Sequence, residues 1–256
     1  MVFTIKIDSL YSHILLLKMI PVSGITFWKR VCMPLTQRTA QILSTKQKEL
    51  QGLKWTDGEA NTESGFSKLG CECAEEAWNH IKVRFPEYKD ITLTFTSPDI
   101  NITISIHSND SIYAKIELKS GKGKIIPGST IGKLDINQPT IFCLRKEGPE
   151  QTFEFRYSQY HSCIGEKDTD MFQDRTPRPF VNFNKMTGID TPIEYIEKEK
   201  GDWIEHYANC AVFRIEEGIE SSWQDTLTKI IMKKAIDEYI KNTSVEEFAK
   251  LKSELQ

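Results

Sequence analysis

The stretch that decides the fold class is ITLTFTSPDINITISIHSNDSIYAKIELK, residues 91 to 119. Apolar and polar residues alternate in three runs, which begin at Ile91, Ile100 and Ile112. Alternation with a period of two is typical of β-strands that bury one face and leave the other face polar. The stretch therefore predicts three consecutive strands with one apolar and one polar face.

The flanking segments predict helices and two further strands. Apolar residues from Phe66 to Ile81 recur at spacings of three and four, which predicts a half-buried helix over residues 66–84. Ser244 and Glu247 match a capping box, the pattern that opens a helix. The remaining expected elements are strands at 140–145 and 152–157 and helices at 223–241 and 245–255. The expected fold class is α/β (α+β), with a mixed central sheet flanked by helices.

Composition narrows the class of protein. Of 256 residues, 39% are hydrophobic and 27% are charged, which favours a folded, soluble chain over a disordered one. The net charge of −3 excludes a wholly basic nucleic-acid coat, although a local basic patch remains compatible with it. Six cysteines in a chain with a large core indicate reduced thiols in an intracellular, cytoplasmic protein. No apolar run reaches 18 residues, so no membrane partner is expected.

The expected domain organisation is simple. Residues 1–32 mix apolar patches with lysines and are interpreted as an N-terminal extension, with a poorly formed signal peptide as the alternative. Residues 33–256 are expected to form a single domain. Within it, residues 159–192 are polar, turn-rich and aromatic, without a regular period, and are interpreted as an insertion.

The second and third predicted strands bring charged residues together. A three-residue connection at 108–110 keeps every isoleucine of both strands on one face. In that register Asp99 lies opposite Lys119, and Glu117 is a diagonal neighbour of Asp99, with backbones about 7–8 Å apart. Two carboxylates at this spacing on one face can bind a small cation between them.

This arrangement suits phosphate chemistry that uses Mg²⁺. The ion prefers oxygen ligands and commonly binds one or two carboxylates together with water and a substrate phosphate. Lys119 would lie beside it, able to orient water or to stabilise charge on the phosphate. The alternative is structural: Glu117 and Lys119 form a solvated surface pair, and Asp99, after Pro98, is a turn residue.

These residues also carry a resemblance to a known family. The segments SPDI (97–100) and KIELKSGKGK (115–124) resemble the PD-(D/E)xK nuclease superfamily. The longer stretch from IELKSGKGKIIPGSTIGKLDINQPTIFCLR to DRTPRPFVNF further resembles type II restriction endonucleases encoded by large DNA viruses of algae and related giant viruses. The resemblance covers roughly residues 60 to 190 and implies a restriction-endonuclease-like core.

The resemblance implies a role for each residue of the motif. Asp99 and Glu117 would bind the metal, the backbone carbonyl of Leu118 would be a further ligand, and Lys119 would be the catalytic lysine. Members of the superfamily often add an acidic residue from the helix before the first strand. The candidates there are Glu72, Glu75 and Glu76, and Glu76 is chosen because it lies nearest the edge of the apolar stripe.

The implied activity is hydrolysis of double-stranded DNA at a short sequence with Mg²⁺ as cofactor. The resemblance also implies a homodimer, since a two-fold symmetric protein can cut both strands of a palindrome. A cognate DNA methyltransferase that protects the same site is implied in the same way. Two other functions remain open: a repair or recombination nuclease that recognises DNA structure, and a non-catalytic module that binds DNA or protein.

Two segments are expected to contact DNA. The first follows Glu117 and combines glycines with basic and hydroxyl side chains, which suits contacts to phosphates. Its candidates are Lys122, Lys124, Ser129, Thr130 and Lys133. The second is the insertion, whose Gln159, Arg175 and Arg178 carry groups that read base edges. The alternatives are a solvated lysine loop and an ordinary surface loop.

The pair Cys71 and Cys73 raises the possibility of zinc. A structural zinc site needs four ligands, and no second Cys/His pair is nearby. Cys73 also falls on the apolar stripe of the predicted helix. A buried thiol is therefore the preferred interpretation of Cys73.

Overall fold

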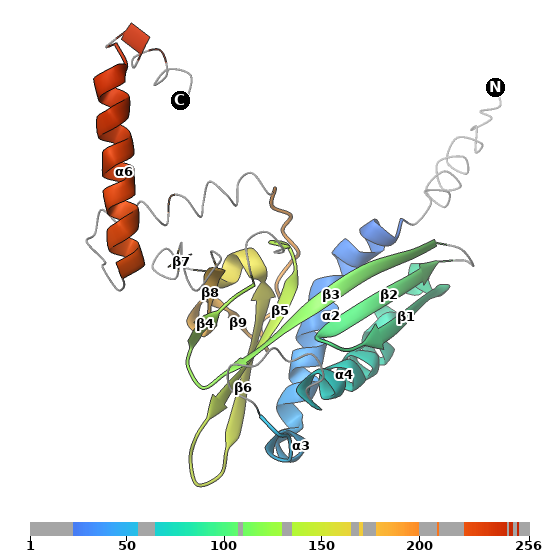
Figure 1. Cartoon of the computed structure of the whole chain (residues 1–256). Helices are drawn as coiled ribbons and strands as arrows, with labels where there is room; N and C mark the ends of the chain where they lie inside the picture. The colour runs from blue at the N-terminus through green and yellow to red at the C-terminus, as the bar shows by residue number, and fades with distance from the viewer. Residues whose placement is uncertain are drawn as a thin grey trace, which may run out of the picture. The chain divides into compact units, whose positions relative to one another are not determined.

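The alternating stretch forms three antiparallel strands in the computed structural model (Figure 1). They are β1 (Ile91–Thr96), β2 (Ile100–Ile106) and β3 (Asp110–Gly121). Ile100, Ile104 and Ile116 are fully buried, which confirms the apolar face. The structure describes residues 23–55, 65–106, 110–129, 135–164, 169–170, 178–199, 209, 223–244, 246–247 and 250.

The register between β2 and β3 differs from the expected one by two residues. Ile106 pairs with Asp110, so the connection comprises residues 107–109 instead of 108–110. The expected register was therefore wrong. Because side chains alternate with a period of two, a shift of two residues leaves every side chain on its expected face and changes only its neighbours across the strands.

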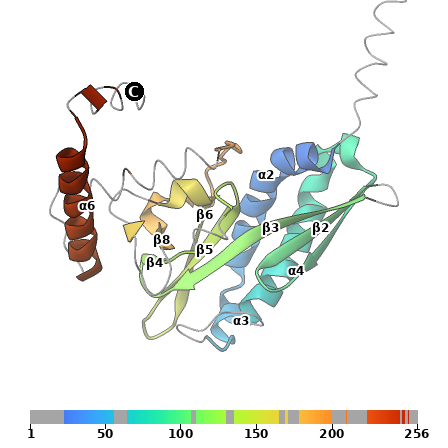
Figure 2. The same cartoon turned by 45° about the horizontal axis from the view of Figure 1, so that its top comes forward.

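Two long helices pack against these strands. They are α2 (Gly24–Thr45) and α4 (Gly65–Ile81), with the short α3 (Gln47–Gln51) between them. Helix α2 contacts α4, and both lie against the same side of the three strands (Figures 1 and 2). Phe66, Cys73 and Ala77 of α4 are buried, as the helical period predicts. At Gly70 the helix approaches β3 closely: a Cβ there would lie 2.7 Å from Leu118 Cδ1.

The helix expected over residues 66–84 ends in two short turns. The α-helical part stops at Ile81 and continues as the 3₁₀ turn η1 (Lys82–Arg84), followed by η2 (Pro86–Tyr88). Pro86 begins η2, where its missing N–H is tolerated. The chain then enters β1, so this turn sets the direction of the first strand.

Helix α2 runs across the boundary expected at Met33. Phe27 and Val31 lie before that boundary and are both fully buried. Residues 24–32 therefore belong to a core helix instead of an extension. The rest of the expected extension, residues 1–22, lies outside the described residues.

The second half of the chain contributes a hairpin and a small sheet. Strands β5 (Pro139–Lys146) and β6 (Thr152–Gln159) pair antiparallel at their expected places, and β9 (Thr187–Gly188) pairs with β6. The small sheet comprises β4 (Ile125–Pro127), β8 (Arg178–Asn182) and β7 (Thr169–Asp170). Two 3₁₀ turns, η4 (Tyr160–Cys163) and η5 (Phe183–Lys185), follow β6 and β8. Phe142 and Phe183 meet edge to face in the core of this half, with ring centroids 5.3 Å apart.

Hydrogen bonding defines a mixed six-stranded sheet in the order β1-β2-β3-β5-β6-β9, and helices flank it. This arrangement confirms the expected fold class, a mixed sheet flanked by helices. By internal packing the chain divides into two units. One comprises the residues up to Lys119 together with Ile189–Tyr195, and the other comprises Ser120–Gly188 and the residues from Ile196 onward.

The C-terminal part contains α6 (Trp223–Asn242), close to the expected helix at 223–241. Ile230 and Ile236 on this helix are about half exposed. The capping box after α6 is present: the Glu247 N–H donates to Ser244 Oγ, and Glu247 Oε2 accepts from the Ser244 N–H at 3.0 Å. Most of the helix expected at 245–255 lies outside the described residues. Among the helices that are described, none is long and apolar enough to span a membrane.

Candidate active site

The turn between β1 and β2 presents Asp99. It contains a cis peptide bond between Ser97 and Pro98, and Asp99 has a φ of 52°. Aspartate is one of the few residues that enter this left-handed region readily. The Asp99 N–H donates to Ser67 Oγ at 3.2 Å, and its carbonyl accepts from Cys71 Sγ at 3.5 Å. The first turns of α4 therefore hold the backbone of Asp99 in place.

The carboxylate of Asp99 reaches β3. Its Oδ1 accepts a hydrogen bond from the backbone N–H of Leu118 at 3.0 Å, and its Oδ2 lies 2.7 Å from Lys115 Nζ. The observed register explains this position. Asp99 precedes Ile100, whose partner in β3 is Ile116, so Asp99 enters the sheet beside this part of β3. The expected partner of Asp99, Lys119, lies two residues too far along β3.

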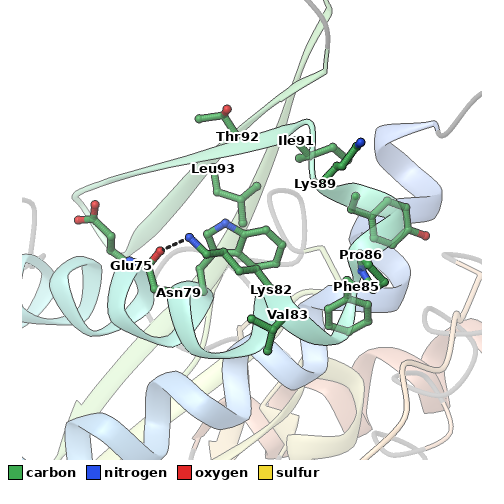
Figure 3. A pocket seen from close by; sticks show the side chains of 12 residues that line it. Glu75, Asn79, Lys82, Val83, Phe85, Pro86, Lys89, Ile91, Thr92 and Leu93 are labelled. Atoms are coloured by element: carbon green, nitrogen blue, oxygen red, sulfur yellow. Dashed lines mark hydrogen bonds between the residues drawn. The ribbon is translucent and has the colours of Figure 1, made fainter.

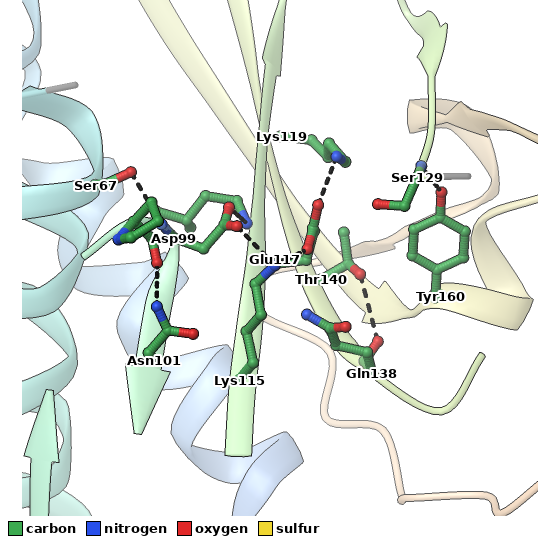
Figure 4. A network of polar contacts seen from close by, with 12 residues as sticks. Ser67, Asp99, Asn101, Lys115, Glu117, Lys119, Ser129, Gln138, Thr140 and Tyr160 are labelled. Carbon is green, nitrogen blue, oxygen red and sulfur yellow. Dashed lines mark hydrogen bonds and ion pairs between the residues drawn. The ribbon is translucent and has the colours of Figure 1, made fainter. Parts of the chain in front are cut away.

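Glu117 projects from the polar face of β3 and is only 6% exposed (Figure 4). Its Oε2 lies 2.6 Å from Lys115 Nζ, and its Oε1 lies 2.5 Å from Lys119 Nζ. Burial alone raises the pKa of the Glu117 carboxyl, but Lys119 and Lys115 outweigh that effect and lower the pKa from 4.5 to about 2. The residue is therefore a buried carboxylate at neutral pH and does not form the solvated surface pair of the structural alternative.

Asp99 and Glu117 converge on one point. Both carboxylates contact the same ammonium group, that of Lys115, so they face one another across a single cation position. The sequence predicted that these carboxylates share a face and lie close enough to bind one cation, and the contacts support both points. Mg²⁺ is commonly bound by one or two carboxylates together with water and a substrate phosphate, so the two carboxylates fit the expected metal.

Lys115 is the member of this network that the motif did not indicate. Burial lowers the pKa of its ammonium, while the facing Glu117 and Asp99 carboxylates raise it by more, so that the net shift is upward. Lys115, Glu117 and Lys119 occupy alternate positions on β3 and therefore share one face of the strand. This period of two is the signal in the sequence that identifies Lys115.

The structure does not bring Glu76 to the acidic pair. The part of α4 that contacts Asp99 is its first two turns, through Ser67 and Cys71. Glu76 is five residues beyond Cys71, about 7.5 Å farther along the helix axis, and is exposed. These contacts do not support the choice of Glu76 as a ligand, which stays a prediction. The glutamate next to the contacting turn is Glu72, whose charge acts on the Cys71 thiol.

The buried-thiol interpretation of Cys73 agrees with its surroundings. Cys73 is 1% exposed, and burial raises the pKa of its thiol to about 12. The five cysteines of the described residues are free thiols. Within the described part of the chain, no cluster of three or more His, Cys, Asp or Glu side chains is placed to hold a metal ion.

The expected phosphate-binding loop follows β3. Lys122 and Lys124 are exposed, and Lys122 Nζ lies 2.7 Å from Glu147 Oε1. The Ser129 N–H donates to Tyr160 Oη at 2.7 Å, which ties the end of the loop to η4. Thr130, Lys133 and Arg175 lie outside the described residues. Arg178 begins β8, where its backbone pairs with Asp170.

Gln159 does not read bases in this fold. Its side chain is 2% exposed, and the amide group is used internally. Nε2 donates to the carbonyls of Asn137 and Ile196 at 3.3 and 2.9 Å, and Oε1 accepts from the Ile196 N–H at 2.7 Å. The expectation that Gln159 binds DNA was therefore wrong, because its amide is committed to two backbone segments.

A separate hollow of about 630 Å³ lies between the end of α4 and β1 (Figure 3). Trp78, Phe85 and Leu93 line it, and Lys82 Nζ at its edge donates to Asn79 Oδ1 at 2.7 Å. None of the residues of the acidic pair contributes to its walls. The hollow lacks a second carboxylate facing Glu75, so it does not repeat the arrangement around Lys115.

Comparisons with known proteins returned no relative: no family model, no curated protein and no solved structure matches this chain. The resemblance to PD-(D/E)xK nucleases therefore rests on the motif residues themselves. The contacts among Asp99, Lys115, Glu117 and Lys119 are the observations from which function can be argued.

Proposed function

We propose that the protein is a Mg²⁺-dependent endonuclease that hydrolyses double-stranded DNA at a specific short sequence. One observation carries the proposal: the Asp99 and Glu117 carboxylates face one cation position, and a second ammonium, that of Lys119, contacts Glu117. This is the constellation that the motif of the resembling nucleases requires. The restriction-endonuclease-like core is part of the same proposal.

Asp99 and Glu117 would hold the metal, and the backbone carbonyl of Leu118 is a further candidate ligand. When bound, Mg²⁺ would neutralise negative charge on the phosphate and promote the ionisation of water. The carboxylates are suited to this task because each is already fixed. Leu118 N–H holds Oδ1 of Asp99, and Lys119 holds Oε1 of Glu117. Such preorganisation lowers the cost of binding a cation that demands a regular geometry.

Lys119 would act on the reacting phosphate. Its side chain is 18% exposed, so the ammonium can contact a substrate while Glu117 fixes its position. It would orient the attacking water and stabilise negative charge that develops on the phosphate oxygens. Water attacks phosphorus in line, the bond from phosphorus to the 3′ oxygen breaks, and that oxygen takes up a proton. The products are a 5′-phosphate and a 3′-hydroxyl.

The DNA partner would be contacted by the loop after β3. Lys122 and Lys124 are exposed there and suit contacts to phosphates. Arg175 and Arg178 are the candidates for reading bases, since arginine pairs well with guanine. A homodimer would place two such sites on the two strands of a palindrome. A cognate methyltransferase would protect the same sequence in the source genome.

Digestion of a sequenced supercoiled plasmid tests the proposal. The purified protein is incubated with the plasmid with Mg²⁺ or with EDTA, and the ends of the products are sequenced. The expected result is a fixed set of fragments, formed only with Mg²⁺, whose ends share one short sequence and carry 5′-phosphates. Cutting confined to branched or damaged DNA would instead indicate a repair or recombination nuclease.

Replacement of the two motif residues separates catalysis from mere binding. Glu117→Ala and Lys119→Ala are each compared with the parent protein on the same plasmid, after circular dichroism shows that they are folded. Both variants should lose cleavage while retaining the fold. If both cut as well as the parent, the network is a structural ion-pair cluster, and a non-catalytic binding module becomes the better interpretation.

A further inference from the structure

The Lys115 ammonium occupies the position where the two carboxylates converge. Its Nζ lies 2.7 Å from Asp99 Oδ2 and 2.6 Å from Glu117 Oε2. Lys119, by contrast, approaches Glu117 from its other oxygen, Oε1. The two lysines therefore have different places in the network: one lies between the carboxylates and the other lies beside them (Figure 4).

Each carboxylate also has a contact that does not involve Lys115. Once the ammonium withdraws, Asp99 Oδ1 still accepts from the Leu118 N–H at 3.0 Å, and Glu117 Oε1 still contacts Lys119. The side chain of Lys115 is 36% exposed, twice the 18% of Lys119, so it has a route to solvent. Its long, flexible stem allows the ammonium to move by several ångströms while the strand stays in place.

The exchange of one cation for another also changes the charge of the site. Two carboxylates and two ammonium groups balance one another in the network as it stands. If a divalent cation replaces the Lys115 ammonium, the group of charges gains one net positive charge. An anionic phosphodiester is then attracted to a site that was previously neutral.

We propose that Lys115 is a built-in counter-ion that fills the cation position of the metal-free protein and is displaced when a divalent metal binds. This inference rests on the proposed function, because it assumes that Asp99 and Glu117 bind a metal. Lys115 would thereby weaken metal binding and couple metal loading to the attraction of DNA. It is a regulatory residue of the site and not a catalytic one.

Metal affinity tests the proposal directly. Binding of Mn²⁺, an oxygen-preferring ion with a paramagnetic signal, is measured by electron paramagnetic resonance without DNA for the parent, Lys115→Met and Lys119→Met. Lys115→Met should bind Mn²⁺ about tenfold more tightly, because no ion pair has to break first. Lys119→Met also removes a positive charge but does not vacate the cation position, so its gain should be smaller. An equal gain in Mn²⁺ affinity in both variants would mean that the loss of a positive charge alone explains the effect. That result would overturn the proposed displacement of Lys115.

Chemical labelling tests the same step in the unmodified protein, so it does not depend on whether a variant folds. Lysines are acetylated with a water-soluble ester, with and without saturating Mn²⁺, and each site is quantified by mass spectrometry. Labelling of Lys115 should rise several-fold with Mn²⁺. Lys122, in its exposed pair with Glu147, is the internal control and should not change. Unchanged labelling of Lys115 despite measured Mn²⁺ binding would overturn the proposal.

The outcomes distinguish this inference from the nuclease proposal. A gain in Mn²⁺ affinity by Lys115→Met in a protein that cuts no DNA would support the counter-ion and reject the nuclease. If the protein cuts DNA with Mg²⁺ but the parent and Lys115→Met bind Mn²⁺ equally well, the nuclease proposal is supported and the counter-ion is rejected. If neither the parent nor Lys115→Met binds Mn²⁺ at millimolar concentrations, both proposals fail at their shared step.

Discussion

Glu117 on β3 and Gln159 on β6 are both polar and both buried, yet they serve different purposes. Glu117 is 6% exposed and Gln159 is 2% exposed. Glu117 contacts the ammonium groups of two lysines, whereas Gln159 holds the backbone of Asn137 and Ile196. The sequence suggested a functional role for both residues.

The difference lies in whether the partners can be exchanged. A lysine ammonium at the end of a flexible stem can be replaced by another cation, so a carboxylate that faces it can bind a ligand. A backbone carbonyl or N–H cannot withdraw without a local change of fold, so an amide bound to it is structural. Burial of a polar group therefore indicates function only together with the nature of its partners.

Neutralising Glu117 should have the largest effect on activity. Glu117→Gln keeps the shape of the side chain and removes the charge that would hold the metal. Cleavage of plasmid DNA with Mg²⁺, measured as an initial rate, should fall at least about a hundredfold. The matched control is Glu154→Gln, which removes a strand glutamate that also faces two basic residues, Lys146 and Arg156.

Glu154 is far more exposed than Glu117, so its neutralisation should change the cleavage rate by less than about twofold. An equal loss of cleavage in Glu117→Gln and Glu154→Gln would mean that general charge is responsible. That result would remove the special role assigned to the carboxylate on β3.

Removing the amide of Gln159 should have its main effect on stability. Gln159→Ala leaves the Ile196 N–H and the Asn137 carbonyl without this partner, while the Ile196 carbonyl keeps its contact with His161 Nε2. A polar group left unsatisfied on folding costs about 1–3 kcal/mol. Urea unfolding should show a loss of about 2 kcal/mol in the free energy of unfolding. The cleavage rate of the folded variant should stay close to that of the parent. A stable variant that has lost sequence-specific cutting would restore the base-reading role.

The strand pattern of the sequence predicted the polar face of the candidate site but not its neighbours. Burial of isoleucines distinguishes the two faces of β3, so Asp99 and Glu117 could be assigned to one side. It cannot distinguish registers that differ by two residues, because both bury the same side chains. The pattern therefore could not predict the hydrogen bond from the Leu118 N–H to Asp99, which depends on the register between β2 and β3.

Two other features, the start of α2 and the role of Lys115, were not predicted from the sequence and became clear only from the packing. The helix α2 begins before Met33, and its buried Phe27 and Val31 keep the helical spacing of four, but Pro34 in its interior is a residue that usually ends or kinks a helix. Lys115 was visible in the alternation but not in the Glu-x-Lys motif, which starts two residues later. The short motif thus carried the nuclease hypothesis, while the period of the strand indicates which further side chains share the candidate site.

Acid should weaken the network around Glu117 in a defined range of pH. The folded pKa of this carboxyl is lowered to about 2 from 4.5, so its stabilising contribution is complete above about pH 4.5 and is lost as the pH falls towards 2. Urea unfolding of the parent should show a loss on the order of 1 kcal/mol between about pH 5 and about pH 3 that Glu117→Gln lacks. Parallel pH profiles for the two proteins would contradict the assigned shift.

The smallest effect is expected at Lys122, which offers an exposed contrast to the buried network. Its Nζ lies 2.7 Å from Glu147 Oε1, but both side chains are largely solvated, and such pairs contribute less than about 1 kcal/mol. Lys122→Ala should therefore leave urea unfolding unchanged while it weakens DNA binding. The plot of log affinity against log salt should lose about one unit of slope, since one phosphate contact is removed. An unchanged slope would place the loop after β3 away from the DNA.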